Sequence, residues 1–354
     1  MKKSVCLQVL KNQGQKSLAL TRRLHLINAE LKIQSDNKHI YIPLARQPSK
    51  PTLKTLQRRL KVYRICVRSF SKKEKKAGSL SSFLKREVPS DLLLSVPKAY
   101  DVIGDVAILQ IPLQHEKYES AIGEAVLKFN PMVHTVLSKA GAIQGRYRLR
   151  KFKVLAGERK TETVHKEYGC LYHLDVARVF FSPRLSFEHH RIASFVCEDE
   201  VVVDLFAGVG SFSIQIAKTH PEATVYAVDA NSCAIDYLKK NISVNRLAGR
   251  VKPVHGDAKK VFKGKSGFAD RVIMNLPEKS LNYVDVACKI IKPSGGIIHF
   301  YTFVSKTESL ENRKARLFRA VTRSGRNVKK VISSRLVRET APYEKQACID
   351  IEIC

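Results

Sequence analysis

Residues 201–231 contain the side chains whose types and spacing most directly suggest chemistry. β-prone residues lead to Asp204 and Phe206, a turn with Gly208 and Gly210 follows, and an apolar segment with helical periodicity comes next. Glycines let the backbone approach a ligand closely, and the N-terminus of a following helix offers free N–H groups. The pattern therefore predicts a ligand-binding turn between a strand and a helix.

Acidic residues follow the next two predicted strands. Asp229 lies about twenty residues beyond the turn, where a carboxylate can accept hydrogen bonds from ribose hydroxyls. Asp257 follows the third strand and can accept a hydrogen bond from an adenine amino group. The dinucleotide fingerprint G-x-G-x-x-G is incomplete, because Ser213 stands at its third glycine, so NAD binding is disfavoured. Residues 204–212, D-x-F-A-G-x-G-x-F, instead resemble the first motif of class I methyltransferases, which implies S-adenosylmethionine as the cofactor.

The C-terminal part of the chain predicts an α/β fold. We expect its strands at 201–206, 224–229, 251–255, 270–275, 296–303, 328–337 and 346–353, with helices between the earlier ones and a hairpin joining the last two. Seven strands with one terminal strand antiparallel match the mixed sheet of a class I (Rossmann-like) methyltransferase domain.

Changes in composition predict two further domains ahead of this sheet. We expect a small basic α/β domain at 1–70, whose charge suits nucleic acid, then an α+β domain at 78–194, and the S-adenosylmethionine-binding domain at 195–354. Within the middle domain, the pattern predicts a buried strand at 104–111, a helix at 118–129, and strands at 133–137 and 146–154.

The charge of the chain indicates a polyanionic partner. Lys and Arg number 63 against 32 Asp and Glu, for a net charge of +31. An excess of Lys and Arg side chains releases counterions when it contacts phosphates. A nucleic acid is therefore a better candidate for the partner than a membrane surface. No acidic residue occurs from Asn37 to Lys73, and a solvated face is the simpler alternative for such a stretch. The candidate RNA-binding residues are Arg58, Arg59, Lys61, Arg64 and Arg68.

The remaining composition disfavours a membrane protein and a metal site. The chain lacks an apolar run of about 18 residues, and its N-terminus does not resemble a signal peptide. Its eight cysteines include no C-x-x-C pair, so we expect no metal and mostly reduced thiols, as in a cytoplasmic protein.

Asn275 and Pro277 stand at the end of the fourth predicted strand of this sheet. Ligands of open α/β sheets bind at the carboxyl ends of strands, so Asn275 is expected to face the methyl group of the donor. Methyltransferases that act on exocyclic amines have Asn/Asp-Pro-Pro-aromatic here, whereas this chain has Leu276 at the first proline and no aromatic residue. An ordinary strand-ending turn also uses Asn and Pro, and stays open as an alternative.

Four segments together resemble one family. Residues 155–158, 172–185, 188–192 and 275–277 are similar in sequence and order to the archaeal and eukaryotic type of tRNA guanine-N1-methyltransferase, and the similarity covers about residues 85–354. That family methylates N1 of guanosine at position 37 of tRNA. The bacterial enzyme of the same activity has a knotted fold, which the predicted strand order excludes.

The resemblance also implies roles for individual residues. Arg148 matches the arginine that stabilises charge on guanine O6, Glu188 matches the proposed general base for N1–H, and Asn275 and Pro277 match residues lining the target-base site. Guanine N1 is protonated at neutral pH, so methylation requires a base at N1 and benefits from a cation near O6. The cofactor-binding candidates are His189, Asp204, Phe206, Gly208, Gly210, Asp229, Ala230, Asp257, Ala258 and Asn275.

The chain departs from its relatives at two positions, and other functions stay open. Phe180 replaces a frequent Tyr and therefore lacks its hydroxyl, and the bulky Phe187 stands where Gly or Ala is common. The alternatives are methylation of a tricyclic wybutosine precursor, aminocarboxypropyl transfer in the same pathway, and a non-enzymatic tRNA-binding protein. We expect tRNA as the partner, no membrane association, no obligate protein partner and a monomer.

Overall fold

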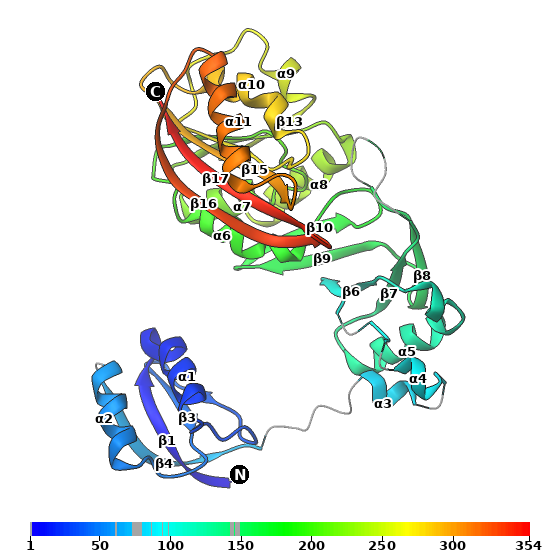
Figure 1. Cartoon of the computed structure of the whole chain (residues 1–354), viewed down its shortest axis with the longest axis vertical. Helices are drawn as coiled ribbons and strands as arrows, with labels where there is room; N and C mark the ends of the chain where they lie inside the picture. The colour runs from blue at the N-terminus through cyan, green and yellow to red at the C-terminus, as the bar shows by residue number, and fades with distance from the viewer. Residues whose placement is uncertain are drawn as a thin grey trace. The chain divides into compact units, whose positions relative to one another are not determined.

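The computed structural model describes residues 2–60, 62–72, 80–85, 87–93, 95–97, 99–141, 145 and 149–354. The chain divides into two compact units, Met1–Gly78 and Ser79–Cys354 (Figure 1). Arg148, Lys61 and the basic segment at 73–79 lie outside the described residues. The predictions made for them are therefore not tested by the structure.

The first unit is a small α/β fold, as the sequence predicts. Its four strands pair antiparallel in the order β2-β3-β1-β4. Apolar residues of both α-helices pack in one core with Leu7 and Ile42 from the sheet. Arg64 and Arg68 lie on the edge strand β4, and both side chains are exposed. The elements are β1 Lys2–Leu10, η1 Lys11–Gln13, α1 Gly14–Arg23, β2 Gln34–Ser35, β3 His39–Pro43, α2 Lys50–Arg59 and β4 Tyr63–Phe70.

The second unit begins with a four-stranded sheet of order β5-β6-β7-β8, against which α5 packs. The buried strand predicted at 104–111 is observed over a shorter range as β6, because Gly104, at φ +57°, lies in the turn that joins β5 to β6. A Cβ at Gly104 would collide with Thr163. The elements are α3 Leu80–Leu84, α4 Ser90–Leu93, β5 Asp101–Ile103, β6 Val106–Leu109, η2 Leu113–Tyr118, α5 Glu119–Phe129, β7 Thr135–Lys139 and β8 Phe152–Gly157.

The large sheet has seven strands in the order β13-β12-β11-β14-β15-β17-β16. The strands from β11 to β15 are parallel, and β17 is antiparallel to both of its neighbours, which confirms the predicted mixed sheet. The strands are β11 Val201–Asp204, β12 Thr224–Asp229, β13 Val251–His255, β14 Arg271–Met274, β15 Gly296–Ser305, β16 Val328–Ala341 and β17 Glu344–Ile353.

Helices cover both faces of this sheet. One core contains residues of α6, α7 and α8, and the other contains residues of α10 and α11. The helices are η3 Pro183–Leu185, α6 Ser186–Ala193, α7 Ser211–Thr219, α8 Ser232–Val244, α9 Ala258–Val261, η4 Ser280–Tyr283, α10 Val284–Ile290 and α11 Leu310–Arg323.

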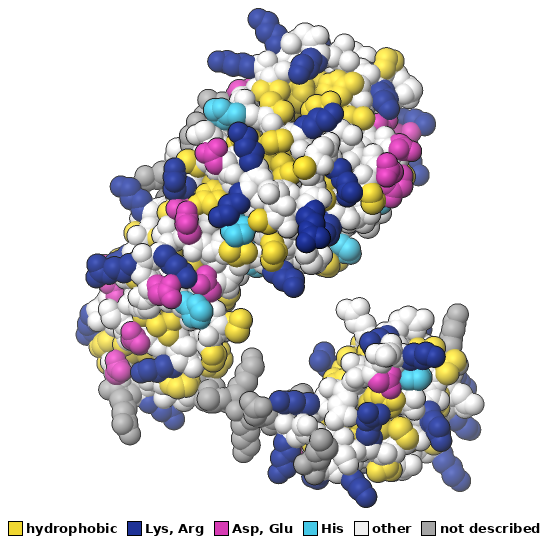
Figure 2. All heavy atoms as spheres, turned by 180° about the vertical axis from the view of Figure 1, so that it is seen from behind, with side chains coloured by type: hydrophobic (Ala, Val, Ile, Leu, Met, Phe, Trp, Pro, Cys, Tyr) yellow, Lys and Arg dark blue, Asp and Glu magenta, His cyan; other side chains and the backbone are white. Residues whose placement is uncertain are grey.

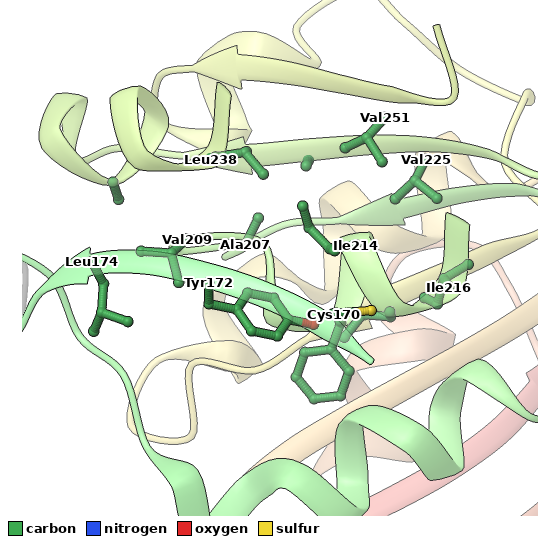
Figure 3. Close-up of a cluster of buried hydrophobic side chains, with 14 of the residues drawn as sticks. Cys170, Tyr172, Leu174, Ala207, Val209, Ile214, Ile216, Val225, Leu238 and Val251 are labelled. Carbon is green, nitrogen blue, oxygen red and sulfur yellow. The ribbon is translucent and has the colours of Figure 1, made fainter. Parts of the chain in front are cut away.

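A hairpin of β9 Glu162–Glu167 and β10 Cys170–Asp175 packs against the first of these cores. Figure 3 shows Tyr172 of β10 beside Val209 and Ile214, which follow β11. Two side-chain amides fasten the hairpin to α8, since Asn241 and Asn245 bond the backbone of β10. The hairpin and α6, predicted as part of the preceding domain, therefore share a core with the large sheet.

The cysteines differ strongly in exposure. All eight are free thiols; Cys197 and Cys354 are exposed, whereas Cys6 and Cys348 are among the buried ones. Burial and a hydrogen bond with Cys66 raise the pKa of Cys6 to about 12. We expect a thiol reagent at neutral pH to label the two exposed cysteines first and the buried ones only after unfolding, because the thiolate is the reacting form. Rapid labelling of Cys348 in the folded protein, read by peptide mass mapping, would contradict this packing.

Candidate active site

The turn after β11 is built as the sequence predicts. Gly210 has φ +95°, and a Cβ there would lie 2.5 Å from Leu238 and 2.8 Å from Ile214, so only glycine fits. The Asp204 carboxylate accepts a hydrogen bond of 3.0 Å from the Ser213 hydroxyl and is fully buried. Burial raises the pKa of Asp204 to about 7. Asp204 and Gly210 thus hold the turn in shape and do not line a cavity.

Asp229 ties the end of β12 to this turn. Its carboxylate accepts hydrogen bonds of 2.8 Å from the backbone N–H groups of Gly208 and Asn231. Burial raises the pKa of Asp229, and those N–H groups oppose the effect. The second lone pairs of both oxygens stay able to accept further bonds.

A pocket that is open to solvent at its mouth lies over the carboxyl ends of β11, β12 and β14. Eight of the predicted residues line it: Phe206, Gly208, Asp229, Ala230, Asp257, Ala258, Asn275 and Pro277. The sequence did not single out other lining residues, among them Asn231, Tyr283, Phe303, Arg338 and Gln346. Tyr283 comes from η4, and its ring packs edge to face against the ring of Phe206, with the ring centroids 4.9 Å apart. No sequence motif marks these positions, since they converge only through the sheet.

The side chains that line this pocket fit an S-adenosyl ligand. Two carboxylates, Asp229 and Asp257, stand where ribose hydroxyls and an adenine amino group need acceptors, and Phe206 and Tyr283 supply an apolar wall. A Cβ at Gly208 would meet only the carbonyl oxygen of Phe180, at 3.7 Å, so the protein leaves room at the turn.

His189 is not brought to this pocket. Its ring is buried, bonds Glu167 at 2.8 Å and packs edge to face on Phe212 at 4.7 Å. The structure therefore gives His189 a place between α6 and α7, behind the pocket wall. Its predicted cofactor contact stays a prediction.

Glu188 is also absent from the pocket lining and is held between two cations. Its carboxylate accepts hydrogen bonds from the Arg191 guanidinium, the shortest 2.8 Å, and from the Tyr301 hydroxyl at 3.0 Å. Arg335 of β16 lies 3.1 Å from its other oxygen. Glu188 is only 1% exposed, whereas the Arg335 side chain is 34% exposed. Arg335 is thus the contact most accessible to an incoming ligand.

A buried polar network continues from Arg191 across the large sheet. Arg191 donates to Asp350 at 2.7 Å, and Asp350 bonds Nδ1 of His299 at 2.6 Å. Arg271 donates to Nε2 of His299 at 2.9 Å. Because an arginine only donates, Nε2 must accept, so Nδ1 carries the proton and the imidazole is neutral. Burial lowers the pKa of His299, in agreement with this tautomer.

A second cavity adjoins the first and is lined by charged side chains of both signs. The two share Phe180, Phe303 and Arg338 as lining residues. The second is also lined by Lys139, Arg150 and Arg184, among others. Burial and the nearby Arg150 lower the pKa of Lys139. Four carboxylates also line the second cavity, so the first pocket opens beside a site that carries both charges: Asp101, Glu278, Glu339 and Glu344.

Family comparisons agree with this architecture. Residues 163–331 match the TRM5/TYW2 methyltransferase domain, residues 80–161 the TYW2 N-terminal domain, and residues 6–52 the tRNA methyltransferase 5 N-terminal domain. The tRNA (guanine(37)-N(1))-methyltransferase Trm5b of Pyrococcus abyssi is 38% identical over 266 residues, 75% of this chain and 78% of that protein. The chain belongs to the TRM5/TYW2 methyltransferase family.

Other members of the TRM5/TYW2 family match most of this chain. Trm5b of Methanocaldococcus jannaschii is 33% identical over 357 residues, 99% of this chain and 98% of that protein. The tRNA 4-demethylwyosine(37)-methyltransferase Taw21 of Saccharolobus solfataricus is 34% identical over 257 residues, 72% of this chain and 94% of that protein.

Solved structures of TRM5 proteins share the fold. The complex of aTrm5 with tRNALeu is 32% identical with a TM-score of 0.69, covering 99% of this chain and 100% of that one. The M. jannaschii Trm5 complex with adenosine is 31% identical with a TM-score of 0.63, covering 98% of both chains. The predicted class I methyltransferase fold is therefore confirmed.

In the described part of the chain, no helix is long and apolar enough to cross a bilayer. The same residues contain no cluster of three or more His, Cys, Asp or Glu side chains suited to a metal ion.

Proposed function

We propose that this protein transfers a methyl group from S-adenosylmethionine to N1 of guanosine 37 in tRNA. The observation that carries the proposal is the pocket with Asp229, Asp257 and Asn275 at the strand ends. Relatives named for this activity match the chain at 33% and 38% identity, which supports it. We further propose that the protein acts as a monomer in the cytoplasm.

The pocket residues divide between holding the cofactor and holding the base. Asp229 would accept from the ribose hydroxyls and Asp257 from the adenine, with Phe206 against the ring. When bound, S-adenosylmethionine supplies an electrophilic methyl group. Asn275 and Pro277 stand at the end of β14, where the target base would reach that methyl group.

Methylation of guanine N1 requires removal of its proton, and Glu188 is the proposed base. The carboxylate is held by Arg191, Tyr301 and Arg335, so it must give up one contact before it can accept a proton. We propose that the target nucleotide displaces Arg335, the contact nearest to solvent. The predicted cation at O6, Arg148, lies outside the described residues, but Arg150 lines the adjoining cavity.

The simplest test uses an unmodified tRNA transcript. Incubation with the protein and S-adenosylmethionine, followed by mass mapping of nucleosides, should yield 1-methylguanosine at position 37. Formation of a product only from tRNA that carries 4-demethylwyosine would favour the wybutosine reaction, which the similarity to Taw21 motivates. Binding of tRNA without any product would favour the non-enzymatic alternative.

Asp229 provides a direct test of the cofactor site. Asp229→Ala should weaken S-adenosylmethionine binding about 10- to 100-fold, because a hydrogen bond to a charged acceptor contributes about 1.5–3 kcal/mol. Isothermal titration calorimetry without tRNA measures this directly. Asp236→Ala, an exposed position on the adjacent helix α8, is the matched control. Equal affinity in Asp229→Ala and the control would refute the assignment.

We propose that the first unit binds tRNA away from the reacting base. Arg58, Arg59, Arg64 and Arg68 are exposed on α2 and β4, and Figure 2 shows Lys and Arg side chains spread over the visible surface. Deleting residues 1–70 should raise the Michaelis constant for tRNA roughly tenfold or more, since phosphate contacts dominate such binding. The single-turnover rate at saturating tRNA should change far less. Unaltered tRNA affinity after the deletion would exclude this division of roles.

A further inference from the structure

Asn275 is the polar side chain at the end of β14. A series of hydrogen bonds between side chains determines which way its amide points. Gln346 of β17 donates from Nε2 to Oδ1 of Asn275 at 3.0 Å. Arg338 of β16 donates from Nε to Oε1 of Gln346 at 2.8 Å, and from a terminal nitrogen to Ser182 at 2.6 Å. Gln346 is only 1% exposed, so water does not replace these bonds.

Which atoms donate and which accept in this series of hydrogen bonds follows from the chemistry of arginine. A guanidinium has no acceptor, so the Gln346 atom that faces Arg338 must be the carbonyl oxygen. The amide nitrogen of Gln346 then faces Asn275, and Asn275 must present its own oxygen to Gln346. Arg338 and Gln346 are opposite each other on paired strands, which holds the arrangement in place.

The consequence is that the Asn275 side chain offers its NH₂ group, and not its oxygen, to the pocket it lines. The two guanine substituents beside N1 are O6, an acceptor, and the 2-amino group, a donor. A fixed donor matches only O6. That oxygen gains negative charge when N1 loses its proton, so the bond strengthens in the transition state.

We propose that Arg338 and Gln346 are positioning residues that hold Asn275 as a hydrogen-bond donor to O6 of the target guanine. The inference rests on the proposed guanine-N1 methylation. It separates Asn275 from the asparagine of methyltransferases that grip an exocyclic amine, which must accept a hydrogen bond.

Gln346→Glu tests the proposal with little change in shape. A carboxylate still accepts from Arg338 but cannot donate, so Asn275 turns its NH₂ toward it and presents an oxygen to O6. The single-turnover rate at saturating tRNA and donor should fall about 10²- to 10³-fold, the usual cost of losing one such donor. Donor affinity and melting temperature should stay at wild-type values. A Gln346→Glu protein with the wild-type rate would overturn the proposal.

Two further comparisons guard against a purely structural effect. Asn275→Asp keeps the oxygen that Gln346 bonds but lacks the NH₂, and should show a similar loss of rate. In an Asn275→Ala background, Gln346→Glu should cause no additional loss, because the residue acts only through Asn275. An additional loss of tenfold or so in that background would contradict a positioning role.

A tRNA with inosine in place of guanosine at position 37 shows which atom of the base Asn275 bonds. Inosine keeps O6 and N1–H but lacks the 2-amino group, so the loss in Gln346→Glu should be as large on inosine as on guanosine. A loss that disappears with inosine would mean that Asn275 accepts from the 2-amino group, against the proposal. The wild-type protein must first form 1-methylguanosine; its failure to do so would refute the proposed function, whereas equal rates for wild type and variants would refute only this inference.

Discussion

Replacing Glu188 with glutamine is expected to lower the single-turnover rate of methyl transfer by about 10²- to 10⁴-fold, the usual contribution of a general base. Glutamine has nearly the same shape and can still accept a bond from Arg191 or Tyr301, so binding of donor and tRNA should persist. Rapid quench of enzyme-bound tRNA measures the chemical step. Glu200→Gln, a carboxylate ahead of β11 and paired with Arg271, is the control and should keep the wild-type rate.

The pH dependence of the two proteins should also differ. With Glu188 present, the rate should rise with pH only until the carboxylate is ionised. In Glu188→Gln, solvent hydroxide must remove the proton, so the slow rate should keep rising toward the pKa of guanine N1. A near-normal rate with an unchanged pH profile would remove Glu188 from the mechanism.

Asp350→Ala is expected to reduce the free energy of unfolding by about 3–5 kcal/mol, because it breaks a buried ion pair with Arg191 and leaves the Nδ1–H of His299 without its acceptor. Asp350 is fully buried and bonds both Arg191 and His299. Urea unfolding followed by circular dichroism measures the change. Glu352→Ala on the same strand is the matched control, since its pair with Lys329 is exposed and should contribute no more than about 1 kcal/mol.

The pH dependence of stability follows from the same network. Burial alone would raise the pKa of Asp350, but hydrogen bonds from His299 and Arg191 outweigh it and hold that pKa below its ordinary value. The pKa of His299 is also lowered by burial. Both groups therefore stabilise the fold above their unfolded-state pKa values, about 3.9 and 6.5, and this stability is lost as the pH falls. The difference between wild type and Asp350→Ala should shrink in acid; a difference that grows below about pH 4 would contradict it.

Periodicity and turn residues in the sequence were sufficient to predict the large sheet. Each predicted strand of that sheet overlaps an observed one, because alternating apolar runs and glycine turns act locally. The strand predicted at 104–111 is shorter in the structure, because Gly104 belongs to the turn before β6.

The sequence by itself also determined the pocket residues that follow strand ends, such as Asp229, Asp257 and Asn275, because the carboxyl ends of neighbouring parallel strands meet at one edge of a sheet. Only the tertiary structure decided which residues far away in the chain complete the site. Arg338 and Gln346 reach Asn275 because β17 inserts antiparallel beside β15. Likewise, Arg335 reaches Glu188 from the distant strand β16, whereas Arg191 is its neighbour one turn along α6. Such pairings depend on sheet order and side-chain direction, which no local pattern of residues encodes.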